Sequence, residues 1–184
     1  MKYSLIAACL LVAGSSFAQD KMNYEHYNRI TEIPGTDYVY ATAEHMGKRS
    51  SGADFLMFIN TRTGETRKVD FPNGSEIHEI KQLKYDSIGL HKLMVLGKTV
   101  DLNDKGGISY GDPRQVIIVS VDGKEKTVIT EDGYYVKHWY ISPSHGTITV
   151  LGYYDSNSNG RLDKSDKSET IVYDLKKMKL LSKT

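Results

Sequence analysis

A pattern of strand, turn and loop recurs along the chain, and this repeat constrains the fold more than any other feature. The tripeptide Val-Leu-Gly occurs at 95–97 and at 150–152, and each copy precedes an aspartate-rich loop and a strand-like run, QVIIVSV or ETIVYDL. DFLMFIN at 54–60 is the equivalent run of an earlier unit. Aligning Ile59, Val119 and Tyr173 gives separations of 60 and 54 residues. Repeats of about four short strands are typical of propeller blades or stacked sheets, whose units need neighbours to bury their faces.

Runs of β-branched and aromatic residues between turn signals predict an all-β protein with few or no helices. Apolar residues in 77–85 are not strictly in phase, so helix and strand compete there, and we favour strand. We expect one domain at 37–184 with three antiparallel, blade-like repeats, at about 37–75, 76–130 and 131–184. The predicted strands are 38–43, 54–60, 65–71, 77–85, 91–100, 115–121, 126–130, 136–141, 147–154 and 169–175.

The first eighteen residues have the pattern of a secretory signal peptide. Lys2 is a short basic start, the apolar core runs over 5–13, and Ser-Phe-Ala at 16–18 is a small-residue cleavage site. The alternative is a lipoprotein box at Ile6-Ala7-Ala8-Cys9, which too few apolar residues precede. We therefore expect a periplasmic or secreted protein, cut after Ala18, with an extended lead-in at 19–36.

Cleavage would remove the single cysteine and bring the formal net charge from +1 to zero. The mature chain would then have no disulfide and no thiol chemistry. Its basic residues are dispersed, which argues against nucleic acid as a partner. No apolar run after residue 18 is long enough for a membrane helix.

The run at 155–166, DSNSNGRLDKSD, has the oxygen spacing of a calcium loop. Gly160 at position 6 allows the sharp turn by which the ligands converge. The alternative is a polar, turn-rich insertion. Strands rather than helices flank the loop, and three carboxylates predict modest affinity, about 10⁻⁴–10⁻³ M as in exported modules. The predicted Ca²⁺ ligands are Asp155, Asn157, Asn159, the Arg161 carbonyl, Asp163 directly or through water, and Asp166.

The run at 101–112, DLNDKGGISYGD, matches this loop at positions 1, 3, 6, 8 and 12. Lys105 stands where a ligand belongs, and Ser109 replaces the acid at position 9. We interpret this run as a degenerate copy. Whether it binds metal stays open, with Asp101, Asn103 and Asp112 as candidate ligands.

The segment SPSHGTITV at 142–150, followed by IVYDLK at 171–176, resembles the "SPDG…IYVYDL…G" blade repeat of TolB-type, WD-repeat-like β-propellers. Some exported bacterial members are similar in carrying an EF-hand-like loop between blade strands. The resemblance covers 136–181 well, 91–127 moderately and 37–69 weakly, and implies blade topology and a binding surface. Three units are fewer than the four to eight blades that close a propeller. We therefore expect a partner or second copy, a twisted sandwich, or coverage by the lead-in.

No catalytic residues are predicted, because the sequence has no H-E-x-x-H and no phosphate-binding glycine loop. The tyrosine pairs at 134–135 and 153–154 suit either a carbohydrate or peptide surface or ordinary strand packing. We expect an exported, non-enzymatic binding or scaffolding module whose protein or glycan ligand is unknown. The alternative is a cell-envelope hydrolase or lyase on the same scaffold.

Overall fold

The computed structural model describes residues 26–44, 55–102, 106–159 and 163–184. In these residues twelve strands form three four-stranded antiparallel sheets, and the single helical element is a 3₁₀ turn at Asp86–Ile88. The predicted all-β fold is confirmed. The predicted signal peptide, the lipoprotein box, and Gly160, Arg161 and Leu162 lie outside the described residues. The strands are β1 (His26–Glu32), β2 (Tyr38–Glu44), β3 (Phe55–Asn60), β4 (Thr66–Asp70), β5 (Glu76–Tyr85), β6 (Leu90–Lys98), β7 (Gln115–Ser120), β8 (Lys126–Val128), β9 (Tyr134–Ser142), β10 (Thr147–Tyr154), β11 (Lys167–Asp174) and β12 (Lys179–Lys183).

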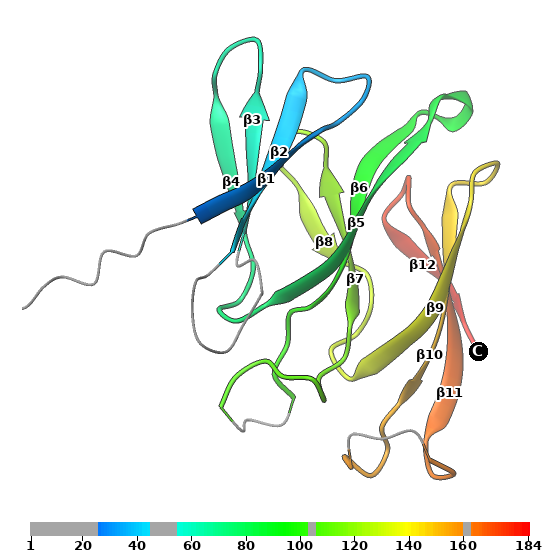
Figure 1. Cartoon of the computed structure of the whole chain (residues 1–184). Coiled ribbons are helices and arrows are strands. Elements are labelled where there is room, and N and C mark those ends of the chain that lie inside the picture. The colour runs from blue at the N-terminus through cyan, green and yellow to red at the C-terminus, as the bar shows by residue number, and fades with distance from the viewer. Residues whose placement is uncertain (1–25, 45–54, 103–105, 160–162) are drawn as a thin grey trace, which may run out of the picture.

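Each sheet is a simple meander of consecutive strands. Sheet 1 has the order β1-β2-β3-β4, sheet 2 the order β5-β6-β7-β8, and sheet 3 the order β9-β10-β11-β12. The three sheets follow one another across the molecule, with sheet 2 in the middle (Figure 1). The ambiguous segment at 77–85 is strand β5. Strand β1 lies within the predicted lead-in and pairs with β2, so sheet 1 begins at His26.

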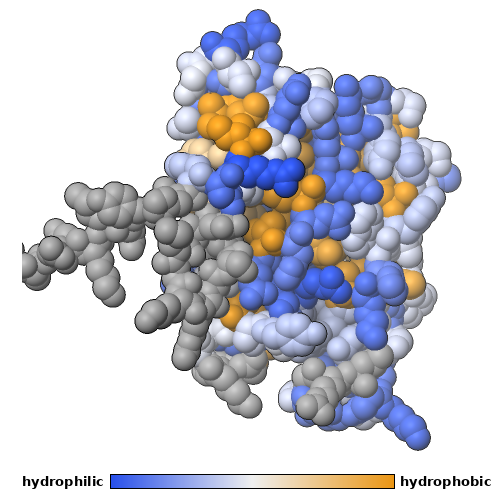
Figure 2. All heavy atoms as spheres, viewed as in Figure 1, coloured by the Kyte–Doolittle hydropathy of each residue, from blue (hydrophilic) through white to orange (hydrophobic). Residues whose placement is uncertain are grey.

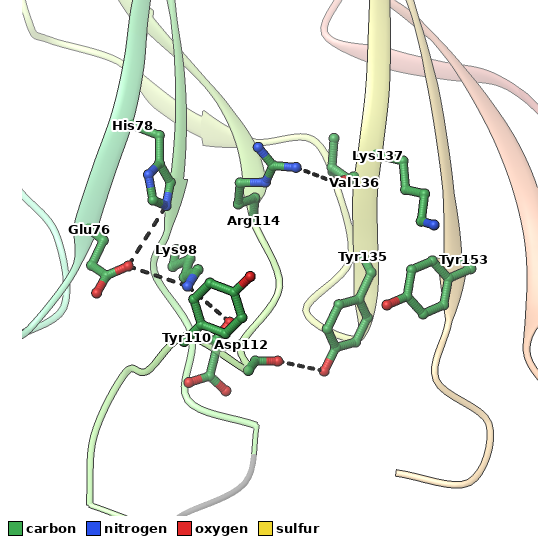
Figure 3. Close-up of a pocket in the computed structure, with 11 residues that line it drawn as sticks. Glu76, His78, Lys98, Tyr110, Asp112, Arg114, Tyr135, Val136, Lys137 and Tyr153 are labelled. Atoms are coloured by element: carbon green, nitrogen blue, oxygen red, sulfur yellow. Dashed lines mark hydrogen bonds and ion pairs between the residues drawn. The ribbon is translucent and has the colours of Figure 1, made fainter. Parts of the chain in front are cut away.

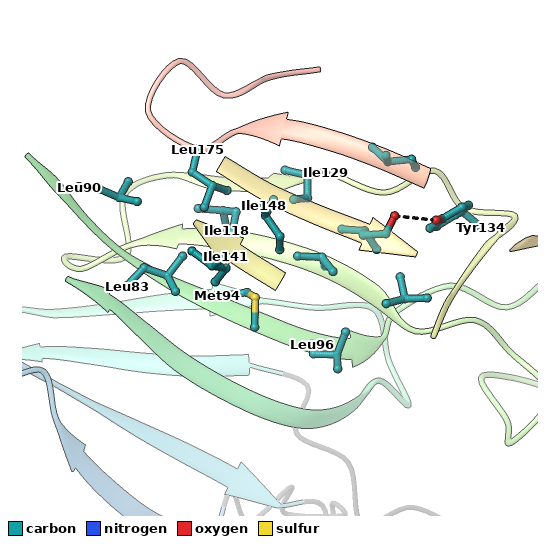
Figure 4. Packing of buried hydrophobic residues seen from close by; sticks show 14 residues of the cluster. Leu83, Leu90, Met94, Leu96, Ile118, Ile129, Tyr134, Ile141, Ile148 and Leu175 are labelled. Carbon is teal, nitrogen blue, oxygen red and sulfur yellow. Dashed lines mark hydrogen bonds between the residues drawn. The ribbon is translucent and has the colours of Figure 1, made fainter. Parts of the chain in front are cut away.

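Sheet 2 is buried on both faces, which explains the nearly continuous apolar sequences of β6 and β7. Alternate side chains of a strand point to opposite faces. Leu93 and Val95 pack with Leu56 and Phe58 of sheet 1, whereas Met94 packs with sheet 3 (Figure 4). Each fully buried side chain of this kind contributes about 1.5–3 kcal/mol relative to an exposed one. The buried residues between sheets 2 and 3 include Leu83, Leu90, Met94, Leu96, Val116, Ile118, Tyr134, Val136, Ile141, Ile148, Val150, Ile171 and Leu175.

The first strand of every sheet carries one extra residue opposite the second strand. These bulge residues are Asn28 in β1, His78 in β5 and Lys137 in β9, as the strand registers show. In sheets 2 and 3 the residue opposite the bulge is a glycine of the Val-Leu-Gly repeat, Gly97 or Gly152. A Cβ on Gly97 would lie 2.8 Å from the Glu76 carbonyl oxygen, so a larger residue does not fit. The repeated glycine therefore marks a close approach of two strands.

The turn after the third strand also repeats. The side chain of Asn60 accepts hydrogen bonds from the N–H groups two and three residues later, at 2.9 and 3.1 Å. Asp174 accepts the same two bonds, at 2.9 Å each. An Asx side chain that bonds the following backbone stabilises a turn locally. These contacts support the alignment of Ile59 with Tyr173.

The face of the molecule in Figure 2 is mostly hydrophilic, with apolar residues in separate small groups between charged side chains. Within the described ranges, no helix has the length and apolar character needed to cross a membrane.

Candidate functional site

The predicted calcium loop connects β10 to β11, and Asp163 is a centre of its hydrogen bonds. Its Oδ2 accepts from the side-chain amides of Asn157 at 2.9 Å and Asn159 at 2.6 Å. Its Oδ1 accepts from the backbone N–H of Ser165 at 2.8 Å and the Ser165 hydroxyl at 2.5 Å. These bonds, those from Ser165 first, hold the pKa of Asp163 well below its usual range. Asn157, Asn159 and Asp163, three of the predicted ligands, therefore contact one another.

Asp166 closes the same loop. Its two oxygens accept from the N–H of Ser156 at 3.0 Å and the N–H of Asp163 at 2.7 Å. Asp155, at the start of the loop, accepts from the N–H of Asn159 at 3.1 Å. The carboxylates at positions 1 and 12 thus fix the backbone at positions 2, 5 and 9.

The loop at 101–112 connects β6 to β7 and is built in the same way. Asp112, at position 12, accepts from the N–H of Leu102 at 3.0 Å and the N–H of Ser109 at 2.6 Å, the positions that Asp166 bonds in the other loop. The predicted repeat therefore extends to individual hydrogen bonds. Asn103 and Lys105, on which the metal question depends, lie outside the described residues.

Among the residues that the structure describes, no group of three or more His, Cys, Asp or Glu side chains is arranged to hold a metal ion. The predicted calcium ligands also include the side-chain amides of Asn157 and Asn159 and the Arg161 carbonyl, which are not among these four residue types. The calcium site stays a prediction.

A cleft of about 490 Å³ lies where sheets 2 and 3 meet, beside the 101–112 loop (Figure 3). Its size falls in the range of about 300–1,000 Å³ typical of small-molecule sites. The bulge residues His78 and Lys137 line it, and so do Glu76 and Tyr135, which lie two residues before them. Because bulges redirect side chains, equivalent features of two neighbouring repeats supply much of its wall. The lining residues are Glu76, His78, Lys98, Tyr110, Gly111, Asp112, Arg114, Tyr135, Val136, Lys137 and Tyr153.

Three tyrosines give the cleft an aromatic surface. The rings of Tyr135 and Tyr153 are stacked, with centroids 5.0 Å apart and planes inclined by 19°. The Tyr135 hydroxyl donates to the Gly111 carbonyl at 3.2 Å, which ties β9 to the neighbouring loop. Tyr110 is 95% exposed, an unusual position for a large aromatic side chain.

Lys98 fixes the loop that forms one side of the cleft. Its ammonium group donates to the carbonyls of Ser109 and Tyr110 at 3.0 Å each, and lies 3.3 Å from a Glu76 carboxylate oxygen. Because its side chain is only 8% exposed, these three partners also satisfy a buried charge. Lys98 is a structural cation.

His78 faces Glu76, with Nε2 and Oε2 3.8 Å apart. Burial lowers the pKa of His78, and the nearby charges of Lys98 and Arg114 add to this effect, whereas Glu76 opposes it. The imidazole is therefore mainly neutral at pH 7 and can both donate and accept a hydrogen bond.

The charges of the two aspartate-rich loops act on the tyrosine pair of the cleft. Burial raises the pKa of Tyr135, and the charges of Asp155, Asp112 and Asp166 raise it further. Tyr153 shows the same pKa change, with burial again the first cause. The two aspartate loops therefore flank the tyrosine pair.

Sequence reasoning found the tyrosine pairs and the aspartate loops but not the cleft. Its walls come from five separate segments, and no motif joins them. The repeated Gly97 and Gly152 were the available signal, because each marks the bulge that directs a residue into the cleft.

Comparison with protein-family models and with curated proteins gives no match. Among solved structures, the chain is similar to a chain in the structure of Tne2 in complex with Tni2, with 11% identity and a TM-score of 0.40. That match covers 81% of this chain and 97% of the other. A likeness at this level carries no conclusion about function. The resemblance to TolB-type blades is tested by none of these comparisons and stays a prediction.

Proposed function

We propose that the chain is an exported, non-enzymatic binding module. Its ligand would occupy the cleft between sheets 2 and 3, and calcium would stabilise the loop at 155–166. The observation that carries the proposal is the construction of the cleft. Repeat-equivalent bulges direct His78 and Lys137 into it, and exposed and stacked tyrosines provide apolar contact area with polar tips.

The donor set of the loop supports calcium. All described candidate side chains offer oxygen atoms, which a hard cation prefers. The amide nitrogens of Asn157 and Asn159 now bond Asp163, and a half-turn of each amide would present its oxygen instead. Calcium must displace these hydrogen bonds, so modest affinity follows. Its role would be to hold β10 and β11 together at the loop.

The calcium proposal is tested by thermal unfolding of the full chain in 10 mM calcium, 10 mM magnesium or chelator. For a Kd of about 10⁻⁴ M, calcium at 100 times Kd adds about 2.7 kcal/mol, or about 5–11 °C for a chain of this size. Asp163→Asn should remove most of this shift, while Asp101→Asn in the degenerate loop should retain it. Equal melting temperatures of the wild type with calcium and with chelator would contradict the proposal.

The binding proposal is tested by ligand-observed NMR with a panel of neutral, cationic and anionic small molecules, sugars and short peptides included. Tyr110→Ala should weaken binding, because this exposed ring lines the cleft. Tyr140→Ala is the matched control, since Tyr140 is also exposed but does not line the cleft. If no compound binds, or if both variants bind alike, the cleft is not a ligand site.

One observation favours the alternative of a hydrolase or lyase. A neutral His78 shares the cleft with Arg114, so a base lies near a group that stabilises negative charge. No serine, threonine or cysteine is among the described lining residues, so the cleft shows no nucleophile of the acyl-transfer type, and we keep the binding module as the leading proposal. Turnover of chromogenic esters or glycosides, or of uronate polymers, that is lost in His78→Asn would favour the enzyme.

A further inference from the structure

The charged side chains that line the cleft do not balance one another, although Asp155 and Asp166 add negative charge from the neighbouring loop. Two carboxylates line the cleft, those of Glu76 and Asp112, against three cations, those of Lys98, Arg114 and Lys137. Glu76 lies 3.3 Å from the Lys98 ammonium group. Its charge is therefore compensated by the structural lysine.

The Asp112 carboxylate accepts hydrogen bonds from residues of its own loop. Asp112 is only 4% exposed, and its oxygens accept from the N–H of Leu102 and from both the N–H and the hydroxyl of Ser109. Hydrogen bonds from several donors stabilise a carboxylate charge in place. Neither carboxylate of the cleft is thus available to Arg114 or Lys137.

Arg114 and Lys137 are the two cations that remain. No described carboxylate lies within 4.0 Å of either in the ion pairs of this structure. The Arg114 guanidinium donates to the Val136 carbonyl through a long bond of 3.4 Å, and the Lys137 ammonium group lies 5.3 Å from the centroid of the Tyr153 ring. Both side chains are exposed and line the cleft beside the tyrosine pair (Figure 3).

We infer that the cleft binds a small anionic ligand through its carboxylate or phosphate group, with Arg114 as the main contact and Lys137 as the second. The planar fork of an arginine matches either group in a two-point hydrogen-bonded contact, and a lysine adds a point charge. Tyr110 and the stacked Tyr135 contact the uncharged part of the ligand. This inference rests on the proposed binding function, for which it names the ligand class.

The test uses the ¹⁵N-labelled full chain at pH 7 and constant ionic strength. The probes are inorganic phosphate, citrate and D-glucuronate, with D-glucose as the neutral analogue. At least one anion should cause saturable shifts of the amide signals of Arg114, Val136 and Lys137, and glucose should not. The phosphate and carboxylate arms distinguish the two ligand chemistries.

Arg114→Gln should weaken anion binding about tenfold or more, because a hydrogen-bonded charge is lost. Arg29→Gln, which removes the same charge from exposed β1, should leave binding unchanged. Arg114→Lys keeps the charge without the fork and should give intermediate affinity, which excludes misfolding as the cause. Lys137→Gln should weaken binding by a smaller factor than Arg114→Gln. Its control is Lys179→Gln on the opposite edge strand, β12, which should leave binding unchanged.

The inference is overturned if no anion saturates these signals, or if the Arg114→Gln and Arg29→Gln variants bind equally well. A neutral or cationic ligand whose binding depends on Tyr110 would overturn the inference and uphold the proposed binding function. If no compound of any charge binds the cleft, both are wrong.

Discussion

Replacing Gly152 by alanine tests the close approach of β9 and β10 at the bulge. A Cβ at this position would lie 2.6 Å from Cζ of Tyr134 and would overlap the carbonyl oxygen of Tyr135. The Tyr134 ring cannot turn away freely, because it is fully buried and its hydroxyl lies 2.8 Å from the Glu169 carbonyl oxygen. The backbone of β9 must move instead.

Overpacking a well-packed interior by one methyl group costs about 1–3 kcal/mol, and the overlap with a backbone atom places Gly152→Ala at the upper end. For a chain of this size, about 3 kcal/mol lowers the melting temperature by about 6–12 °C. Gly111→Ala is the matched control. Gly111 lies in the loop beside the same cleft, and its added Cβ would meet no atom within 4 Å.

The assay is equilibrium urea unfolding followed by fluorescence of Trp139, the only tryptophan of the chain, which lies in β9. The free energy of unfolding should fall by about 3 kcal/mol for Gly152→Ala and by less than about 0.5 kcal/mol for Gly111→Ala. Equal costs for the two variants would refute the account of the repeated glycine as a packing requirement.

Three further predictions follow from the same contacts. Tyr134→Phe should cost about 1–3 kcal/mol in urea unfolding, because it removes the one hydroxyl proton that the Glu169 carbonyl in β11, at 2.8 Å, and the Val150 carbonyl in β10, at 3.1 Å, share; a cost near zero would show that both carbonyls are satisfied elsewhere. Burial raises the pKa of Asp122, but hydrogen bonds from Ser120 and Lys124 outweigh it and lower the pKa from 3.8 to about 2. The folded pKa is below the unfolded one, so this stabilisation is present above pH 4 and is lost as the pH falls toward 2; the loss between these values should be smaller in Asp122→Asn. If a second copy completes the sheet array, the mass in solution is a multiple of the chain mass, and a monomer at all concentrations contradicts that prediction.

The repeat and most of the strands could be predicted from sequence, because β6, β7, β10 and β11 combine β-branched residues with clear turn signals. Strands β1 and β12 could not. β12 is exposed along its whole length, and a strand held mainly by ladder hydrogen bonds leaves little hydrophobic pattern. The aspartate loop was found because calcium-type spacing is local. The cleft forms only because sheets 2 and 3 pack side by side. The sequence around Arg114 or Lys137 does not indicate which sheets become neighbours, so the cleft could not be predicted.

The meander order of all three sheets has a kinetic consequence. Every paired strand is bonded to the strand just before or after it in the chain, so native contacts within a sheet have small sequence separation. Folding rates rise as relative contact order falls, and all-β proteins are slow mainly because their pairings are distant in sequence. This chain should therefore fold faster than a β-sandwich of equal length. Each sheet can assemble from adjacent hairpins before it docks on the next.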